Sequence, residues 1–182
     1  MKSIMTAAFA VLALVPMAPA QALTPAQEDC VGLGMPEALQ SQLVDEMLAN
    51  DSGAQTTEKI MALAKECAVK TDVAPAKHDA YINFAVANAI VLEAGDRLDK
   101  TGYPITTLNS AIDAMVFLSS DTQVPYFSKE GVTDAGIDFL FSYFDEREMN
   151  FEPKGEANLV LLSTYLASAG KIVSVYSQLF GG

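Results

Sequence analysis

The fold class is decided by residues 75–100, which read PAKHDAYINFAVANAIVLEAGDRLDK. Pro75 suits the first turn of a helix, and Gly102 suits the position just after its end. No charged residue occurs between residues 80 and 90. The apolar residues form two stripes at helical spacing, so more than half of the circumference is apolar. We therefore predict a long central helix with neighbours on two sides.

The residues on either side of this segment also predict helices. Caps, prolines and apolar residues spaced three or four apart indicate helices that begin near residues 24, 36, 56, 104, 132 and 153. Residues 121–131 are expected to form a loop. About six helices joined by short loops, with no low-complexity linker, predict one compact all-α domain over residues 23–182, either bundle-like or orthogonal.

One segment, residues 132–148, fits two kinds of element. Four of its apolar residues alternate as in a strand: Ile137, Phe139, Phe141 and Tyr143. Thr133, however, can cap a helix, and Asp134 suits the first turn of one. A lone strand would also have no partner. We favour a helix.

Residues 1–22, MKSIMTAAFAVLALVPMAPAQA, have the pattern of a secretory signal peptide. Lys2 gives the positive start, residues 4–15 are apolar, and Ala20-Gln21-Ala22 is a small-x-small cleavage pattern. The apolar run is too short for a bilayer span, although an uncleaved anchor is the alternative. The alanine-rich form is typical of bacteria. We expect export to the periplasm or the medium, and cleavage that leaves 160 residues.

Export decides how the two cysteines, Cys30 and Cys67, are interpreted. In an oxidising compartment an even pair most simply forms a disulfide. Closing a loop of this length would stabilise the fold by about 3–4 kcal/mol in the chain-entropy model. The alternative, a metal site or a catalytic thiol, lacks both a zinc-ligand spacing and a CxxC motif.

The last long segment, residues 157–180, reads ANLVLLSTYLASAGKIVSVYSQLF and carries one charge, Lys171. Its length alone would allow a membrane span. Its many hydroxyl residues and Lys171 favour instead a helix wrapped by other helices or buried in a dimer, with no stable span in the mature chain. Small residues at helical spacing would let another helix approach closely: Ser163, Ala167, Gly170 and Ser174.

Composition excludes several classes of function. The chain has 23 acidic and 11 basic residues, and its formal net charge is −12. Binding to nucleic acid or to anionic lipid needs an excess of Lys and Arg, so neither is expected. No sequence motif for a metal, a phosphate or another cofactor occurs. We therefore predict no cofactor and no metal.

Catalysis has few side chains to use, because the sequence holds one histidine, two arginines and no tryptophan. His78-Asp79 is the one candidate acid–base pair. Adjacent helical residues point about 100° apart, so Asp79 would not orient His78 as a triad acid does. We predict no catalytic residue and a non-enzymatic protein. A hydrolase that uses His78 or carboxylates remains the third hypothesis.

Aromatic residues gather between positions 117 and 151. Such a cluster can line a pocket for an apolar ligand, although an ordinary aromatic core is the simpler interpretation. Four members form the candidate ligand or contact patch: Tyr126, Phe127, Phe139 and Tyr143. Tyr126 and Phe127 follow Pro125 in the expected loop, so we expect them to be exposed.

Together these features predict an exported helical protein that acts by binding a partner without catalysis, as a chaperone, an inhibitor or an assembly factor does. The partner is expected to be another protein. The alternative is a carrier of a small apolar ligand that uses the aromatic cluster of residues 117–151.

Overall fold

The computed structural model describes residues 23–32, 34–49, 53–122, 125–128 and 130–180. The predicted signal peptide, residues 1–22, lies outside the described residues.

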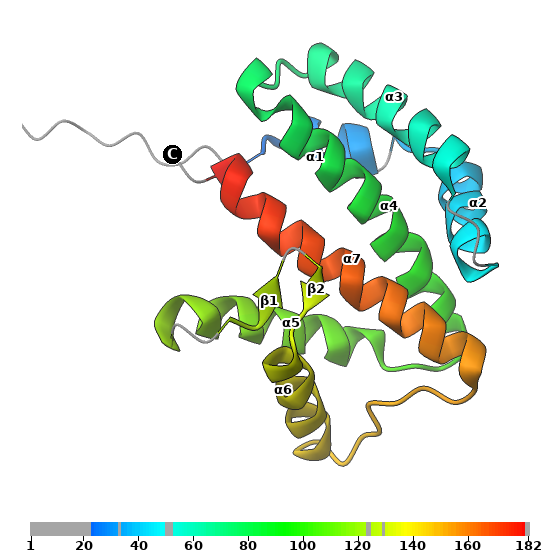
Figure 1. Ribbon diagram of the computed structural model, residues 1–182, viewed down its shortest axis with the longest axis vertical. Coiled ribbons are helices and arrows are strands. Elements are labelled where there is room, and N and C mark those ends of the chain that lie inside the picture. The colour runs from blue at the N-terminus through cyan, green and yellow to red at the C-terminus, as the bar shows by residue number, and fades with distance from the viewer. Residues whose placement is uncertain (1–22, 33, 50–52, 123–124, 129, 181–182) are drawn as a thin grey trace, which may run out of the picture.

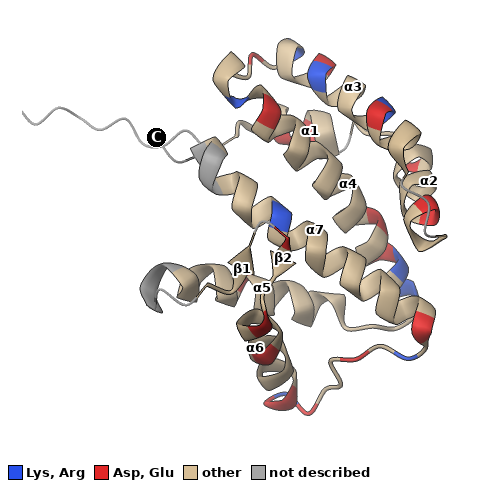
Figure 2. Ribbon diagram, viewed as in Figure 1, with Lys and Arg blue, Asp and Glu red and all other residues tan. Residues whose placement is uncertain are grey.

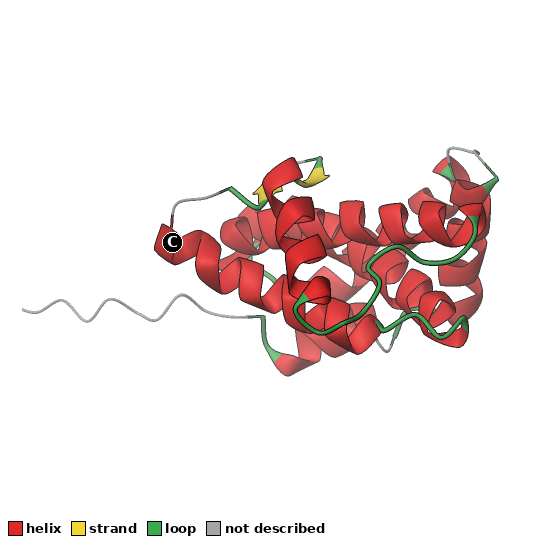
Figure 3. Cartoon of the chain, turned by 90° about the horizontal axis from the view of Figure 1, so that it is seen from below, coloured by secondary structure: helices red, strands yellow, loops and turns green. Residues whose placement is uncertain are grey.

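Helices make up nearly all of the described chain, as Figure 3 shows. They are α1 (Pro25–Gly32), α2 (Glu37–Leu48), α3 (Ala54–Lys70), the 3-10 turn η1 (Pro75–Lys77), α4 (His78–Lys100), α5 (Ile105–Thr122), α6 (Asp134–Asp145) and α7 (Glu156–Phe180). Two short strands, β1 (Phe127–Ser128) and β2 (Gly131–Val132), pair antiparallel. The prediction of one all-α domain is confirmed.

The ambiguous segment is a helix, α6, as we favoured. The Thr133 hydroxyl accepts a hydrogen bond from the Gly136 N–H at 3.3 Å, so Thr133 is the N-cap that the sequence indicated. The same hydroxyl donates to the Pro125 carbonyl at 2.7 Å. This second bond ties the start of α6 to the chain that leads into β1.

The loop predicted over residues 121–131 is wrong in two respects. Helix α5 continues to Thr122, and the strands β1 and β2 occupy part of the rest. The last helix begins at Glu156 and not at Pro153. In both cases the expected boundary followed proline and glycine, which mark boundaries only to within a few residues.

Helices α4 and α7 lie side by side along much of their length at the centre of the fold (Figure 1). On the far side of α4 lie α2 and α3, and on the far side of α7 lie the β1–β2 hairpin, α5 and α6 (Figure 1). The prediction of a long central helix is confirmed, although α4 begins at His78 and Pro75–Lys77 form the 3-10 turn η1 before it. Leu92, an apolar residue of α4, is 46% exposed.

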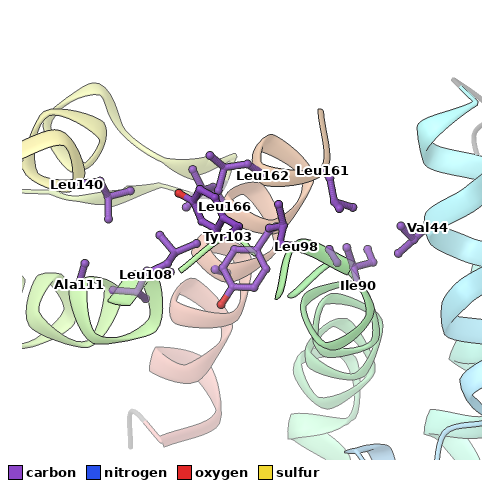
Figure 4. Close-up of a cluster of buried hydrophobic side chains, with 14 of the residues drawn as sticks. Val44, Ile90, Leu98, Tyr103, Leu108, Ala111, Leu140, Leu161, Leu162 and Leu166 are labelled. Carbon is purple, nitrogen blue, oxygen red and sulfur yellow. The ribbon is translucent and has the colours of Figure 1, made fainter. Parts of the chain in front are cut away.

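The buried apolar side chains form two clusters along the α4–α7 pair. The first joins α2, the C-terminal half of α4, α5, α6 and the first half of α7, and Figure 4 shows Leu98, Leu108 and Leu140 converging with their neighbours there. The second joins α1, α3, the N-terminal half of α4 and the end of α7. Helices α4 and α7 contribute to both clusters and supply about half of the buried apolar residues that the structure describes.

Helix α1 is fastened to α3 and α4 by covalent and polar contacts. The sulfur atoms of Cys30 and Cys67 are 2.05 Å apart, so the predicted pairing fits the structure. The Tyr81 hydroxyl donates to the Gln27 carbonyl at 2.6 Å. Thr24 and Gln27 cap α1 reciprocally through backbone N–H to side-chain bonds of 2.9 and 3.3 Å, as the cap sequence predicted.

Two of the small residues of α7, Ala167 and Gly170, meet the β1–β2 hairpin, whereas we expected another helix there. A Cβ atom on Gly170 would lie 2.4 Å from the carbonyl carbon of Gly131. Gly131 itself has φ +137°, a conformation that favours glycine, and its Cα faces the Ala167 backbone. The hairpin backbone therefore lies directly on α7.

Of the described helices, α7 is the one long and apolar enough to cross a membrane, over Glu156–Tyr176. The mean hydropathy there is 1.4, and 44% of the best window is buried inside the fold. Figure 2 shows α7 free of charged residues between Glu156 and Lys171, whereas α2, α3 and α6 carry many. The core helix of a soluble protein passes the same test of length and composition.

Candidate functional site

A cavity of about 610 Å³ lies between α5 and the part of α7 from Tyr165 to Tyr176, with α4 contributing Val91. We call it the α5–α7 groove. Its other lining residues are Asn109, Ile112, Asp113, Val116, Tyr165, Ala169, Ile172, Val173 and Tyr176. Some of these belong to the first buried cluster and some to the second, so the groove lies where the two clusters meet.

Helical spacing explains how two segments far apart in the sequence supply one lining. On α5 the lining residues lie at positions i, i+3, i+4 and i+7, from Asn109 to Val116. On α7 they recur in the same way from Tyr165 to Tyr176. Residues with this spacing share one face of a helix, so each helix presents a single strip to the groove. The α7 strip is mainly apolar, whereas the α5 strip has two apolar residues and two polar ones, Asn109 and Asp113.

Polar groups gather at one end of the groove. The Tyr165 hydroxyl donates a hydrogen bond to Oδ1 of Asn109, and Tyr165 is only 4% exposed. Burial, with the nearby carboxylate of Asp113 as the second cause, raises the pKa of Tyr165 to about 12. Tyr165 therefore keeps its proton at neutral pH, and the Asp113 carboxylate lies near enough to act on it electrostatically.

Tyr176 lies towards the other end of the groove. Its ring packs edge-on against Phe84, with ring centroids 5.6 Å apart. Burial and, second, the Glu28 carboxylate raise the pKa of Tyr176. Apolar side chains surround this end, which Ile172 and Val173 also line.

The predicted patch is partly assembled, but away from the groove. Tyr126 and Tyr143 both pack against Phe139, with ring centroids 5.4 and 5.8 Å away. The Arg147 guanidinium lies 3.5 Å from the centroid of the Tyr143 ring, as a cation–π contact. Phe127 is in strand β1. All four predicted residues are half-buried, whereas we expected Tyr126 and Phe127 to be exposed, and none of the four lines the α5–α7 groove.

His78 begins α4, and its Nε2 lies 2.8 Å from the Val73 carbonyl oxygen. This contact joins the start of α4 to the chain just before it. Within the described ranges, no carboxylate or hydroxyl group is hydrogen-bonded to the His78 ring. The hypothesis of a hydrolase based on His78 gains no support from this arrangement.

Two carboxylates, Glu93 and Asp45, form ion pairs with Arg97. Its Nε donates to Glu93 at 2.7 Å and its Nη1 to Asp45 at 2.6 Å. The Ser41 hydroxyl also donates to Glu93, at 2.8 Å. These contacts join α2 to α4. Among the residues that the structure describes, no group of three or more His, Cys, Asp or Glu side chains could hold a metal ion.

Sequence reasoning missed the groove because each strip alone is typical of an ordinary helix. Asn109 and Asp113 on α5 and Tyr165 on α7 interrupt otherwise apolar strips, which was the available signal. The spacing of residues along each helix does not show which strip lies opposite which in the fold. Comparison with known proteins found no family model, no curated protein and no solved structure that matches this chain.

Proposed function

We propose that this chain is an exported, non-catalytic binding protein that carries a small apolar ligand in the α5–α7 groove. The observation that carries the proposal is the 610 Å³ cavity with a mainly apolar lining. Ligand pockets in proteins are typically clefts of about 300–1,000 Å³, lined by apolar side chains with a few polar groups that orient the ligand. The groove has both properties.

The proposal of export rests on residues 1–22 and on the cysteine pair. The first segment has the three parts of a secretory signal. The proximity of Cys30 and Cys67 supports an oxidising compartment, such as the bacterial periplasm or the medium, because disulfides persist there.

The polar groups of the groove support binding rather than catalysis. The Tyr165 hydroxyl donates its hydrogen bond to Asn109. Its raised pKa makes the hydroxyl a poor proton donor and a poor nucleophile near neutral pH. His78 is not among the residues that line the groove. Asn109, Asp113 and Tyr165 are therefore suited to orient a ligand.

A neutral fluorescent probe tests this proposal. N-phenyl-1-naphthylamine emits strongly in apolar surroundings, and we expect the mature protein to enhance its emission with saturation. Val173→Trp fills the groove and should weaken binding at least tenfold. Val69→Trp, on α3 at a side chain that is 74% exposed, is the matched control and should leave binding unchanged.

Circular dichroism and thermal melting establish that both variants fold. Failure of the wild-type protein to bind the probe would refute the proposal. Equal binding by the Val173→Trp variant and the wild type would show that the probe binds outside the groove, which would also refute the proposal.

A protein partner is the second candidate, favoured by two adjacent exposed apolar side chains on α5. Val116 is 43% exposed and Phe117 is 67% exposed. Exposed apolar residues beside a groove are typical of contact surfaces. Pull-down from the native compartment should then recover one protein, and Phe117→Ser should abolish the recovery while the probe still binds. Recovery of no protein at low ionic strength would contradict this candidate.

A further inference from the structure

The α5–α7 groove has a polar end and an apolar end. Asn109, Asp113 and Tyr165 lie at one end, and Val116, Val173 and Tyr176 lie towards the other. Between Tyr165 and Tyr176 the helix rises by about 16 Å, at 1.5 Å per residue, which is the length of an alkyl chain of about twelve carbons. A ligand that fits both ends is therefore an amphiphile with one polar head.

The hydrogen-bonding groups at the polar end are mainly acceptors. The Tyr165 hydroxyl has already donated its hydrogen to Oδ1 of Asn109, so its oxygen can only accept from a ligand. The Asp113 carboxylate also accepts only. Within the described part of the chain, Asp113 has no hydrogen bond and no ion pair. The Asn109 amide N–H is the remaining donor, and it is uncharged.

The charges in and around the groove also disfavour an anionic ligand. Among the residues that the structure describes, no Lys or Arg lines the groove, and Lys171, although it is on α7, is not a lining residue. Asp113 acts electrostatically on the buried Tyr165 ring, so its charge reaches into the polar end. The chain as a whole carries a formal net charge of −12, which attracts cations and repels anions.

We propose that the ligand is a cationic amphiphile, with an amine or similar nitrogen head bound by Asp113 and Tyr165 and an alkyl tail along α5 and α7. This inference rests on the proposed function of the groove. The ammonium N–H groups donate to the Asp113 carboxylate and to the Tyr165 oxygen. The tail contacts Ile112, Val116 and Val173, which line the rest of the groove.

Competition against the bound neutral probe tests the choice of head group. Three twelve-carbon compounds, each below its micelle concentration, differ only in the head: dodecylamine, dodecanol and dodecanoate. We expect dodecylamine to displace the probe at a concentration about fivefold lower than dodecanol. The advantage is modest because Asp113 is exposed, so water screens the ion pair between its carboxylate and the ammonium head. Dodecanoate should be the weakest. The advantage of the amine should shrink as salt is raised from 20 to 500 mM, because salt screens the ion pair.

Asp113→Asn keeps the shape of the side chain and removes its charge. In this variant dodecylamine should lose its advantage over dodecanol. Asp99→Asn is the matched control, because Asp99 is an exposed carboxylate on α4 outside the groove. It should retain the full preference of the wild type.

The outcomes separate this inference from the function on which it rests. If the probe and dodecanol bind but the amine has no advantage, or if Asp113→Asn leaves the advantage intact, the proposal of a cationic head is wrong. The proposal that the groove carries an apolar ligand is then unaffected. If neither the probe nor any of the three compounds binds, the carrier proposal itself fails.

Discussion

Gly131 of the β1–β2 hairpin and Gly170 of α7 lie in contact backbone to backbone. A Cβ atom on Gly170 would lie 2.4 Å from the carbonyl carbon and 2.5 Å from the Cα of Gly131. The main chain at this point has no side chain that could move aside, so glycine is required on the helix. The contact holds the hairpin, and with it the start of α6, against α7 close to the groove residue Ala169.

Gly170→Ala should therefore destabilise the protein, although the same change in an ordinary exposed helix gains about 1 kcal/mol. We expect a loss of about 1–3 kcal/mol in the free energy of unfolding, as is typical when an atom is forced into a packed contact. Urea unfolding measures this. Ser163→Ala, exposed on the same helix, should be close to neutral. Stabilisation by Gly170→Ala would show that the hairpin does not rest on α7.

Removal of the Cys30–Cys67 link should lower the free energy of unfolding by about 3–4 kcal/mol, because the unfolded chain regains the freedom of the closed loop. The double variant Cys30→Ser/Cys67→Ser and the wild type in reducing agent should unfold at similar urea concentrations. Reducing agent should have no effect on the double variant. Detection of two free thiols in protein taken from its native compartment would contradict the prediction.

Stability should fall as the pH rises above 10, in part because of Tyr165. Its pKa is raised from 10.0 in the unfolded chain to about 12 in the fold, by burial and then by Asp113. Between these values the unfolded state loses the proton first, so stability that is complete below pH 10 is lost as pH approaches 12. The shift corresponds to about 2–3 kcal/mol.

Urea midpoints at pH 9.5, 10.5 and 11.5 measure this dependence. Tyr165→Phe should make the decline shallower. Tyr103→Phe should do so too, because burial raises the pKa of Tyr103, whose hydroxyl donates to the Phe151 carbonyl at 2.6 Å. Slopes equal to that of the wild type in both variants would show that these tyrosines titrate alike in the folded and unfolded states.

The mature chain should separate with the soluble fraction, because α7 buries Leu161, Leu166 and Val175 within the fold. Osmotic shock or collection of the medium should release the protein without detergent. N-terminal sequencing of the released protein should begin at Leu23. Extraction only by detergent would show that α7 or residues 1–22 hold the protein in a membrane.

Much of the fold was predictable because its signals are local. The cap at Thr24, the cap at Thr133 and the helix-starting Pro75 each act within three or four residues, so each could be read without knowing the neighbours. The apolar circumference of residues 80–90 likewise indicated a central helix. The pairing of Cys30 with Cys67 needed only their number and the expectation of export.

The candidate site was not predictable in the same way. The aromatic residues between 117 and 151 drew the prediction to Tyr126, Phe127, Phe139 and Tyr143, because bulky rings are the strongest apolar signal in a sequence. Phe139 packs against Tyr126 and Tyr143, and Phe144 against Tyr103 and Phe151, so these rings fill space among themselves. A cavity arises where side chains fail to fill space, and the spacing of residues along one helix does not indicate where that happens.

The sequence by itself determined the helices, the expected leader and the partner of each cysteine, since these depend on neighbours along the chain or on a count. Only the tertiary structure decided that the strip from Asn109 to Val116 faces the strip from Tyr165 to Tyr176, and that a hairpin backbone lies on Gly170. The physical reason is that packing between distant segments depends on how all side chains fill the interior together, and no single segment contains that information.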